Sequence, residues 1–220
     1  MITGASRGIG LALVKWFSAN HHKVWALSRN TTPITQLNLP NVTVNALDLT
    51  DEDAVAAWSK NEAPDNIDAL INNAGTLLNQ PFSETTKEDF EKIYSVNVFG
   101  LASLTRLLLP IIAPKGHVVN ISSMGGIGGS SKFAGLAAYS SSKGAVNILT
   151  ELLAEEYKET GPSFNTLALG AVQTEMLAQA FPGFKAPLSA KEMAEYIFKF
   201  SMEGHNFFNG KTIPVSSSTP

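Results

Sequence analysis

The chain has 220 residues, of which 44% are hydrophobic and 16% charged, so it is long enough for one domain with a substantial core. Its net charge is −3 and its Lys and Arg residues form no block, which does not favour a nucleic-acid-binding surface. The absence of cysteine excludes disulfides and a thiol nucleophile. We see no apolar run of the roughly 20 residues that span a bilayer and no signal-peptide pattern. We therefore expect a cytoplasmic protein that binds neither nucleic acid nor membrane.

Short apolar runs alternate with longer helical patterns, which predicts parallel βαβ units in a single domain over residues 1–220. The first strand is represented only by Met1 and Ile2 before Thr3, so it is either short or continues upstream. The other predicted strands are 23–28, 41–47, 67–72, 116–122, 163–169 and 211–215, and the predicted helices are 8–19, 51–60, 86–112, 137–159 and 190–203.

Two of the helical segments are apolar almost all round. They comprise residues 96–113 and 145–157, and they offer more apolar surface than one face of a sheet can cover. A subunit interface would cover the rest, and a thick internal core is the alternative. We expect a homodimer or homotetramer formed through residues 96–113 and 137–159.

A glycine-rich turn, TGASRGIG at residues 3–10, lies between the first strand and an amphipathic helix. Glycine has no Cβ to hold a ligand away from the backbone, and the start of the next helix attracts anions. The turn therefore predicts a site for phosphate groups, although turns also use glycine for other reasons.

The stretch AAYSSSKGA at residues 137–145 places Tyr139 four residues before Lys143, so both side chains lie on one helix face. A free tyrosine has a pKa near 10 and is a poor acid or base at neutral pH. We expect the ammonium group of Lys143 to lower the pKa of Tyr139. The alternative is a surface helix with one aromatic side chain and one solvated charge.

Four motifs occur in register: TGxxxGxG at 3–10, NNAG at 72–75, NISS at 120–123 and YxxxK at 139–143. In this order and spacing they resemble the short-chain dehydrogenase/reductase family, over essentially the whole chain. The resemblance implies a Rossmann-type, doubly wound α/β fold with about seven parallel strands in three αβα layers. It also implies an oxidoreductase that binds NAD(P) at the carboxyl ends of its strands.

The resemblance assigns catalytic roles to Asn97, Ser123, Tyr139 and Lys143. Tyr139 would protonate the carbonyl oxygen during reduction, Ser123 would hydrogen-bond the same oxygen, and Lys143 would also hold the nicotinamide ribose. Ser122 is the rival of Ser123, which we choose because a glycine follows it three residues later. Asn97 would anchor a water chain to the lysine, and an ordinary polar helix residue is the alternative.

The resemblance also implies a set of cofactor-binding residues. These are Gly4, Ser6, Arg7, Gly8, Ile9, Gly10, Arg29, Asp48, Leu49, Asn73, Ala74, Gly75, Tyr139, Lys143, Gly170, Val172 and Thr174. Asp48 would lie beside the adenine, with a structural role at a helix start as the alternative, whereas Asn72 would tie strands together.

The residues after the second strand bear on the choice of nicotinamide cofactor. Family members that use NAD usually carry an acidic residue there, whereas this chain has Ser28 and Arg29, with Arg7 in the glycine turn. Two guanidinium groups would suit a 2′-phosphate. We expect a preference for NADP(H), with NAD(H) possible, and two solvated arginines as the alternative.

The substrate site is expected within residues 123–136 and 170–190, where glycines suggest a mobile rim. The segment 175–187 carries Met176, Leu177, Phe181 and Phe184, which would suit an apolar or compact carbonyl compound or would pack against neighbouring helices. We expect a small carbonyl or alcohol substrate. The alternatives are an acyl-carrier-bound or sugar substrate, and a nucleotide-binding regulatory protein without turnover. The four histidines form no ligand-like group, so we expect no metal.

Overall fold

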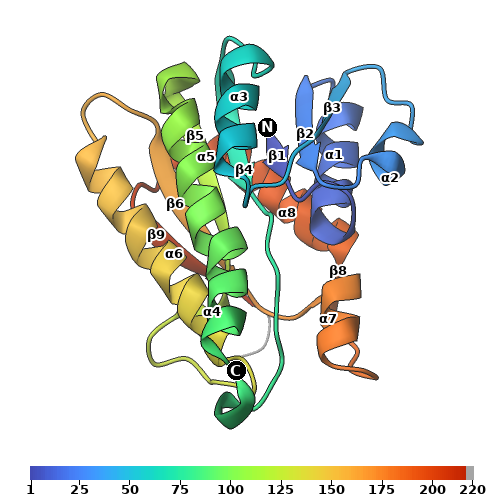
Figure 1. Ribbon diagram of the computed structural model, residues 1–220. Coiled ribbons are helices and arrows are strands. Elements are labelled where there is room, and N and C mark those ends of the chain that lie inside the picture. The colour runs from blue at the N-terminus through green and yellow to red at the C-terminus, as the bar shows by residue number, and fades with distance from the viewer. Residues whose placement is uncertain (217–220) are drawn as a thin grey trace.

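The structure is built on one sheet of seven parallel strands in the order β3-β2-β1-β4-β5-β6-β9 (Figure 1). It is a computed structural model that describes residues 1–216, so the last four residues of the predicted domain lie outside the described part. The strands are β1 (Ile2–Thr3), β2 (Val24–Ser28), β3 (Val42–Ala46), β4 (Ile67–Asn72), β5 (Ile112–Ser123), β6 (Ser163–Leu169) and β9 (Lys211–Val215). The strand order reverses between β1 and β4, which opens a crevice at the carboxyl ends of these strands.

Helices cover both faces of the sheet. They are α1 (Gly8–Ala19), α2 (Thr32–Thr35), α3 (Glu52–Asn61), α4 (Lys87–Tyr94), α5 (Leu101–Leu108), α6 (Ala137–Glu156), α7 (Glu175–Ala180) and α8 (Ala190–Glu203). Helices α1 and α8 pack on one face, and α3, α5 and α6 pack on the other. Figure 1 shows α4, α5 and α6 in front of the sheet. The predicted doubly wound, three-layer αβα fold is confirmed.

The core forms two apolar layers, one on each side of the sheet. On one side, Leu13 of α1 and Ile197 of α8 are fully buried against the strands. On the other side, Leu104 of α5 and Phe164 of β6 are fully buried. Each such side chain contributes about 1.5–3 kcal/mol relative to exposure.

The helix predicted over residues 86–112 is divided into pieces. Helix α4 begins after Thr86, whose side chain forms a capping box with Asp89. It passes into a π-helical turn, η2 (Ser95–Gly100), and then into α5 and the 3-10 turn η3 (Leu109–Ile111). Strand β5 then begins at Ile112, earlier than predicted. A wide π turn has no signature in apolar periodicity, so the sequence did not show it.

The sequence predicted no segment long and apolar enough to span a bilayer, and the helical stretch Lys87–Ile111 shows that this expectation was wrong. It has 25 residues, and its most apolar window has a mean hydropathy of 1.3 with 39% of that window buried. However, Leu101, Leu104 and Leu108 are buried in the core. The apolar character of this stretch is therefore that of a core helix.

A chain of buried polar side chains crosses the centre of the sheet. Asn72 of β4 donates to Asn120 of β5 at 2.8 Å and to Thr105 of α5 at 3.0 Å. Asn120 in turn donates to Thr150 of α6 at 2.8 Å, and Thr166 of β6 also donates to Thr150. Asn72 thus ties neighbouring strands together, as predicted.

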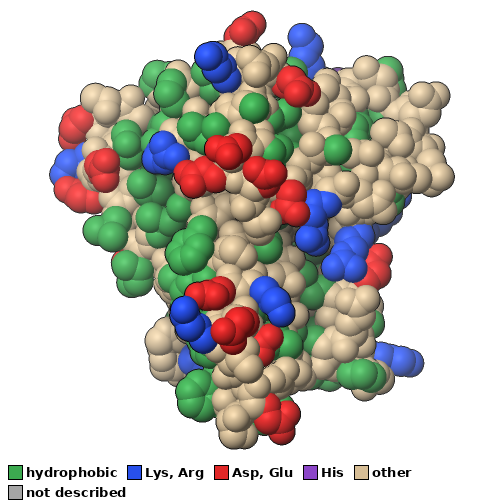
Figure 2. Space-filling model, in the orientation of Figure 1, with side chains coloured by type: hydrophobic (Ala, Val, Ile, Leu, Met, Phe, Trp, Pro, Cys, Tyr) green, Lys and Arg blue, Asp and Glu red, His purple; other side chains and the backbone are tan. Residues whose placement is uncertain are grey.

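Apolar side chains gather on the outer surface of the α5 and α6 layer (Figure 2). Phe99 of η2 and Ile148 and Leu152 of α6 have exposed fractions of 60%, 57% and 62%. The inner sides of the same segments are buried, so these segments are apolar on two faces, as the sequence indicates.

Candidate active site

The predicted catalytic residues converge at the carboxyl ends of the strands. Ser123 ends β5, and Tyr139 and Lys143 lie on the first turns of α6. A Cβ on Gly75 would lie 3.4 Å from Asn97 Oδ1 and 3.5 Å from Lys143 Nζ, so the loop after β4 contacts both side chains. The fold brings these residues to one place although they are far apart in the sequence.

Tyr139 lies between Ser123 and Lys143. The Ser123 side chain lies close enough to Tyr139 to lower the pKa of the phenol, and Lys143 Nζ lies 5.8 Å from the centre of the phenol ring. Lys143 is 4% exposed, and its ammonium group donates to the backbone oxygen of Ile121 at 2.8 Å. This arrangement joins a proton donor, a second hydroxyl and a buried cation.

The expected direction of the tyrosine pKa shift is wrong for the protein alone. Burial raises the pKa of Tyr139 above 10, and the hydrogen bond with Ser123 offsets part of that rise. Burial also lowers the pKa of Lys143 to about 8, because the charged form is disfavoured in the same dehydrated site. The sequence reasoning counted the attraction of the cation but not the loss of water around both groups. At neutral pH, Tyr139 is therefore a phenol and Lys143 an ammonium.

The two candidate serines have different surroundings. Ser122 is 3% exposed and its hydroxyl donates to the backbone oxygen of Lys143 at 3.1 Å, which fixes strand β5 against α6. Ser123 is half-buried, accepts from Gly125 N at 3.2 Å and lies beside Tyr139. The geometry favours Ser123 as the residue that faces a substrate.

Asn97 lies in the π-helical turn η2 and is fully buried. Its side chain accepts from the backbone N–H of Thr76 at 2.8 Å and donates to Thr76 O at 2.9 Å and to Ser142 Oγ at 3.0 Å. Asn97 therefore connects the loop after β4 to α6 beside Lys143.

The glycine turn fits a dinucleotide diphosphate. Gly4 and Gly8 have positive φ angles of 64° and 53°, and a Cβ on Gly10 would overlap the backbone oxygen of Gly4. Within residues 1–216, Arg7 makes no side-chain cap on α1, and the first turn of α1 contains no acidic residue. The backbone N–H groups of this helix start are thus suited to an anion. Ser6 and Ile9 lie on the same turn, and Ile9 also packs against the core.

Asn73 and Thr3 hold the glycine turn against the end of β4. Thr3 Oγ1 accepts from the backbone N–H groups of Asn73 and Ala74, each at 3.0 Å. The Asn73 side chain donates to Thr3 O at 3.0 Å and to Gly4 O at 3.2 Å. Asn73 therefore holds the glycine turn in place through its side chain, whereas Ala74 contributes its backbone N–H. The role of Thr3 was missed, because a threonine in a strand gives no such signal.

The residues expected at the adenine end lie together at the ends of β2 and β3. Arg29 is exposed, and its guanidinium lies 3.9 Å from the Asp48 carboxylate. Hydrogen bonds from Thr50, first from its backbone N–H, hold the pKa of Asp48 below its usual value. The backbone of Leu49 packs closely on Gly100, since a Cβ there would lie 2.7 Å from Leu49 O.

The last group of predicted cofactor residues follows β6. The N–H of Gly170 donates to Val215 O at 2.9 Å, which fixes the exit from the sheet. Val172 is buried in β7 (Val172–Gln173), which pairs with β8 (Leu188–Ser189). The hydroxyl of Thr174 caps α7 by accepting from Leu177 N at 3.2 Å.

Comparison with known proteins identifies the family. The family model described as "short chain dehydrogenase" matches residues 1–183. The chain belongs to the short-chain dehydrogenase family. The resemblance found in the four sequence motifs is thereby confirmed.

Relatives within the short-chain dehydrogenase family carry names of reductases. The chain is 34% identical to "Carbonyl reductase [NADPH] 2" of Sus scrofa over 161 residues, which is 71% of this chain and 64% of that protein. It is 30% identical to "L-xylulose reductase" of Bos taurus, over 90% of this chain and 80% of the relative. A 3-ketoacyl-(acyl-carrier-protein) reductase of Brucella melitensis, complexed with NADH, superposes with a TM-score of 0.84 and 26% identity, over 97% of this chain and 94% of that one.

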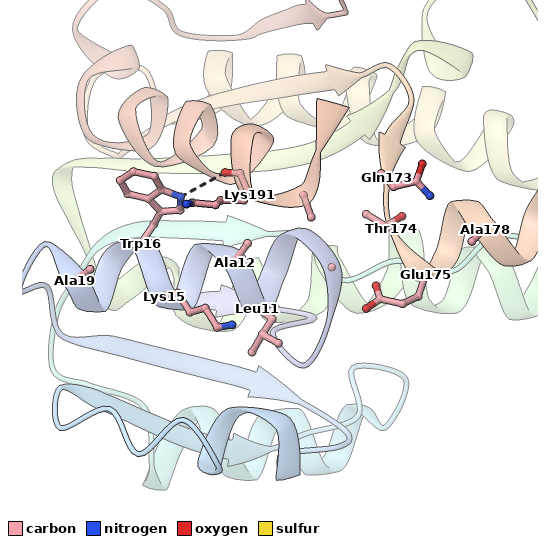
Figure 3. Close-up of a pocket in the computed structure, with 12 residues that line it drawn as sticks. Leu11, Ala12, Lys15, Trp16, Ala19, Gln173, Thr174, Glu175, Ala178 and Lys191 are labelled. Carbon is pink, nitrogen blue, oxygen red and sulfur yellow. Dashed lines mark hydrogen bonds between the residues drawn. The ribbon is translucent and has the colours of Figure 1, made fainter. Parts of the chain in front are cut away.

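A groove of about 760 Å³ lies beside this family's glycine turn, between α1 and α7 (Figure 3). It is lined by Gly8, Lys15 and Trp16 on one side and by Thr174 and Glu175 on the other. It does not include Ser123, Tyr139 or Lys143, so it is separate from the reacting groups. Glu175 had not been singled out from the sequence, yet its carboxylate lies 3.4 Å from where a Cβ on Gly8 would be.

Proposed function

We propose that this chain is an NADPH-dependent oxidoreductase that interconverts a small carbonyl compound and the corresponding alcohol. The observation that carries the proposal is the placement of the Tyr139 phenol beside the Ser123 side chain and the buried Lys143 side chain, whose Nζ lies 5.8 Å from the centre of the phenol ring. Asn97 supports the same site by donating a hydrogen bond to Ser142 Oγ of α6. The reductase and dehydrogenase names of the relatives are consistent with this chemistry.

The raised pKa of Tyr139 suits the direction of reduction. A phenol that keeps its proton at neutral pH can donate it to a carbonyl oxygen, while the Ser123 hydroxyl hydrogen-bonds that oxygen as negative charge develops on it. The Lys143 ammonium then stabilises the phenolate that is left. NADPH, when bound, would supply the hydride for the carbonyl carbon, so that hydride and proton together would yield the alcohol.

The preference for NADPH rests on Arg7 and Arg29. Both side chains are exposed near the ends of β1 and β2. The contact between Arg29 and Asp48 is long, and the two side chains are 73% and 42% exposed, so this ion pair holds Arg29 only weakly. Arg29 can therefore turn to a 2′-phosphate. NADH also remains a possible cofactor, since Asp48 lies at the same end of the site.

We propose that the substrate lies between residues 123–136 and 170–190. The rim there is apolar, because Phe133 and Phe184 are 57% and 51% exposed and Phe181 packs against Phe133. An apolar or compact carbonyl compound would suit this rim.

The test is the oxidation of NADPH by the purified chain with a broad panel of carbonyl compounds. Tyr139→Phe should lower kcat by about 10²–10⁴ and leave the dissociation constant of NADPH unchanged. Tyr94→Phe, on α4, is the matched control and should keep full turnover. Unchanged turnover in Tyr139→Phe would remove Tyr139 from the mechanism. Tight NADPH binding without turnover of any compound would instead indicate a nucleotide-binding regulatory protein.

The cofactor preference has its own measurement. Arg29→Gln should lower kcat/KM for NADPH by about 10-fold, because a hydrogen bond to a charged group is lost, and should leave kcat/KM for NADH unchanged. A wild-type protein whose kcat/KM for NADH equals or exceeds its kcat/KM for NADPH would contradict the preference.

We also propose that the exposed apolar side chains of Phe99, Ile148 and Leu152 are covered by a second copy of the chain, in a homodimer or a homotetramer. Leu152→Glu should then shift the mass measured by light scattering toward the monomer. A monomeric wild-type protein would contradict this part of the proposal.

A cytoplasmic location completes the proposal, and the absence of cysteine is compatible with it.

A further inference from the structure

Residues 174–187, which we name the lid, form a loop whose two ends are fixed at one point. The strands on either side of the lid pair with each other, Val172 with Leu188 and Gln173 with Ser189. The Gln173 side chain also accepts from Ala186 N at 2.9 Å. The base of the lid is therefore closed, and its position depends on contacts farther out.

Helix α7 in the lid has little support of its own. It has six residues, and within residues 1–216 none of them is buried. On its α1 side lies the groove of about 760 Å³, which Figure 3 shows between Ala178 and Glu175 of α7 and Leu11 of α1. A helix this short is not stable by itself. The contacts at its far end therefore decide whether it keeps its place.

Asn79 makes the polar contact at that far end. Its side-chain N–H donates to the backbone oxygen of Ala180, the last residue of α7, at 2.8 Å. Its side-chain oxygen lies directly on Gly135, where any Cβ would overlap it. The next residue, Gln80, donates its backbone N–H to Gly135 O at 2.9 Å. One asparagine thus touches both the lid and the loop that leads into α6.

A ring contact lies beside this hydrogen bond. Phe181, just after α7, meets Phe133 edge to face with ring centres 6.5 Å apart. Phe133 and Gly135 belong to the loop before Leu136, the N-cap residue of α6, and Tyr139 follows on the first turn of that helix. The lid, the loop after β4 and the loop before α6 therefore meet, and the last of these loops leads directly into the helix that carries Tyr139.

We infer that Asn79 is a positioning residue that holds the lid closed over the proposed substrate site. Helix α7, which lies wholly within the described residues, has no buried residue to hold it in place, and the Asn79 side chain holds it instead by linking Ala180 at its end to Gly135. Loss of this side chain frees α7 to move toward the groove beside α1. The position of the lid follows from these contacts alone, whereas its effect on turnover rests on the proposed function.

The test is hydrogen exchange of the lid amides in the intact chain. Asn79→Ala should accelerate exchange of the amides of Leu177 and Phe181 by about three- to tenfold, the range expected for one lost hydrogen bond at an exposed site. Asn79→Asp keeps the size of the side chain but cannot donate to Ala180 O when ionised, so it should accelerate the same amides. Gln80→Ala is the matched control, because it keeps the backbone bond to Gly135 and should leave the lid unchanged.

Kinetics provide a second readout. For a carbonyl substrate found by the NADPH assay, Asn79→Ala should raise KM by no more than the factor seen in the exchange, since KM rises only as the closed fraction of the lid falls. The dissociation constant of NADPH should stay within about twofold. Wild-type exchange rates in both Asn79 variants, or equal acceleration in Gln80→Ala, would overturn the inference. Absence of turnover in the wild-type chain would count against the proposed function alone, because the exchange comparison still decides the role of Asn79.

Discussion

Acidification below neutral pH should destabilise this protein through one buried histidine, His117 of β5. Its side chain is 0% exposed. His117 Nδ1 lies 3.2 Å from Ser201 O, and Nε2 lies 3.0 Å from the side-chain nitrogen of Asn165. The Asn165 oxygen accepts from Lys211 N at 3.1 Å, so its amide presents N–H to the histidine. These partners assign the proton of the neutral ring to Nδ1.

Protonation of His117 would place a second N–H against the amide of Asn165. The other aromatic neighbours are the rings of Phe200 and His205, at 5.3 Å and 5.4 Å. Burial, with a smaller contribution from the charge of His205, lowers the pKa of His117 from 6.5 to about 4. At 1.36 kcal/mol per pKa unit, the difference corresponds to about 3 kcal/mol.

The direction of the effect follows from which state binds the proton. Between pH 6.5 and about 4, the unfolded chain protonates this histidine and the folded protein does not. The free energy of unfolding is therefore at its full value above the unfolded pKa, falls as the pH drops from about 6.5, and levels off near pH 4. The lost stability over this window is about 3 kcal/mol from His117 alone.

The assay is urea unfolding of the wild type and of His117→Gln at a series of pH values across this window. His117→Gln should be less stable at neutral pH but should lose about 3 kcal/mol less than the wild type on acidification. His21→Asn is the control, because His21 is exposed with a φ of 65° that asparagine tolerates. Parallel pH profiles for the wild type and His117→Gln would refute the reasoning.

Two further changes test the site and its scaffold. Lys143→Met should abolish NADPH oxidation. It should also raise the free energy of unfolding at neutral pH, measured in urea, by about 1–3 kcal/mol, because it removes a buried charge. A lower free energy of unfolding in Lys143→Met would contradict the desolvation of Lys143. Gly10→Ala should lower the melting temperature and weaken NADPH binding, since its Cβ would overlap Gly4 O. Gly144→Ala, whose Cβ meets only Gly126 O at 3.4 Å, should be neutral or stabilising by up to about 1 kcal/mol, and equal melting of the two alanine variants would argue against the close approach at Gly10.

The sequence was most informative where a regular pattern met a clear boundary. The ends of α1 and α8 agree with the predicted 8–19 and 190–203, because apolar spacing and flanking residues mark both helices. Helix α6 ends at Glu156, three residues before the prediction, since the pattern fades gradually there. Helix α7 was not predicted, because six residues are too few to show a period.

The sequence predicted that the candidate site residues lie close together, but it did not predict the direction of their pKa shifts. The motifs brought Ser123, Tyr139 and Lys143 together, as the structure does. The raised pKa of Tyr139 depends on how much water surrounds the phenol, and one-dimensional spacing carries no information about that. The contact between Asn79 and Ala180 joins residues 101 positions apart and has no local signature.

The hydrogen bonds that Thr3 and Asn73 form between the ends of β1 and β4 have a consequence for protein engineering. The glycine turn after β1 and the segment after β4 share four hydrogen bonds. Each of these two segments therefore depends on the other for its conformation. Transplanting only the amino-terminal part from a homologue would leave mismatched halves. A chimera that takes its glycine turn from a homologue therefore needs both segments from the same donor.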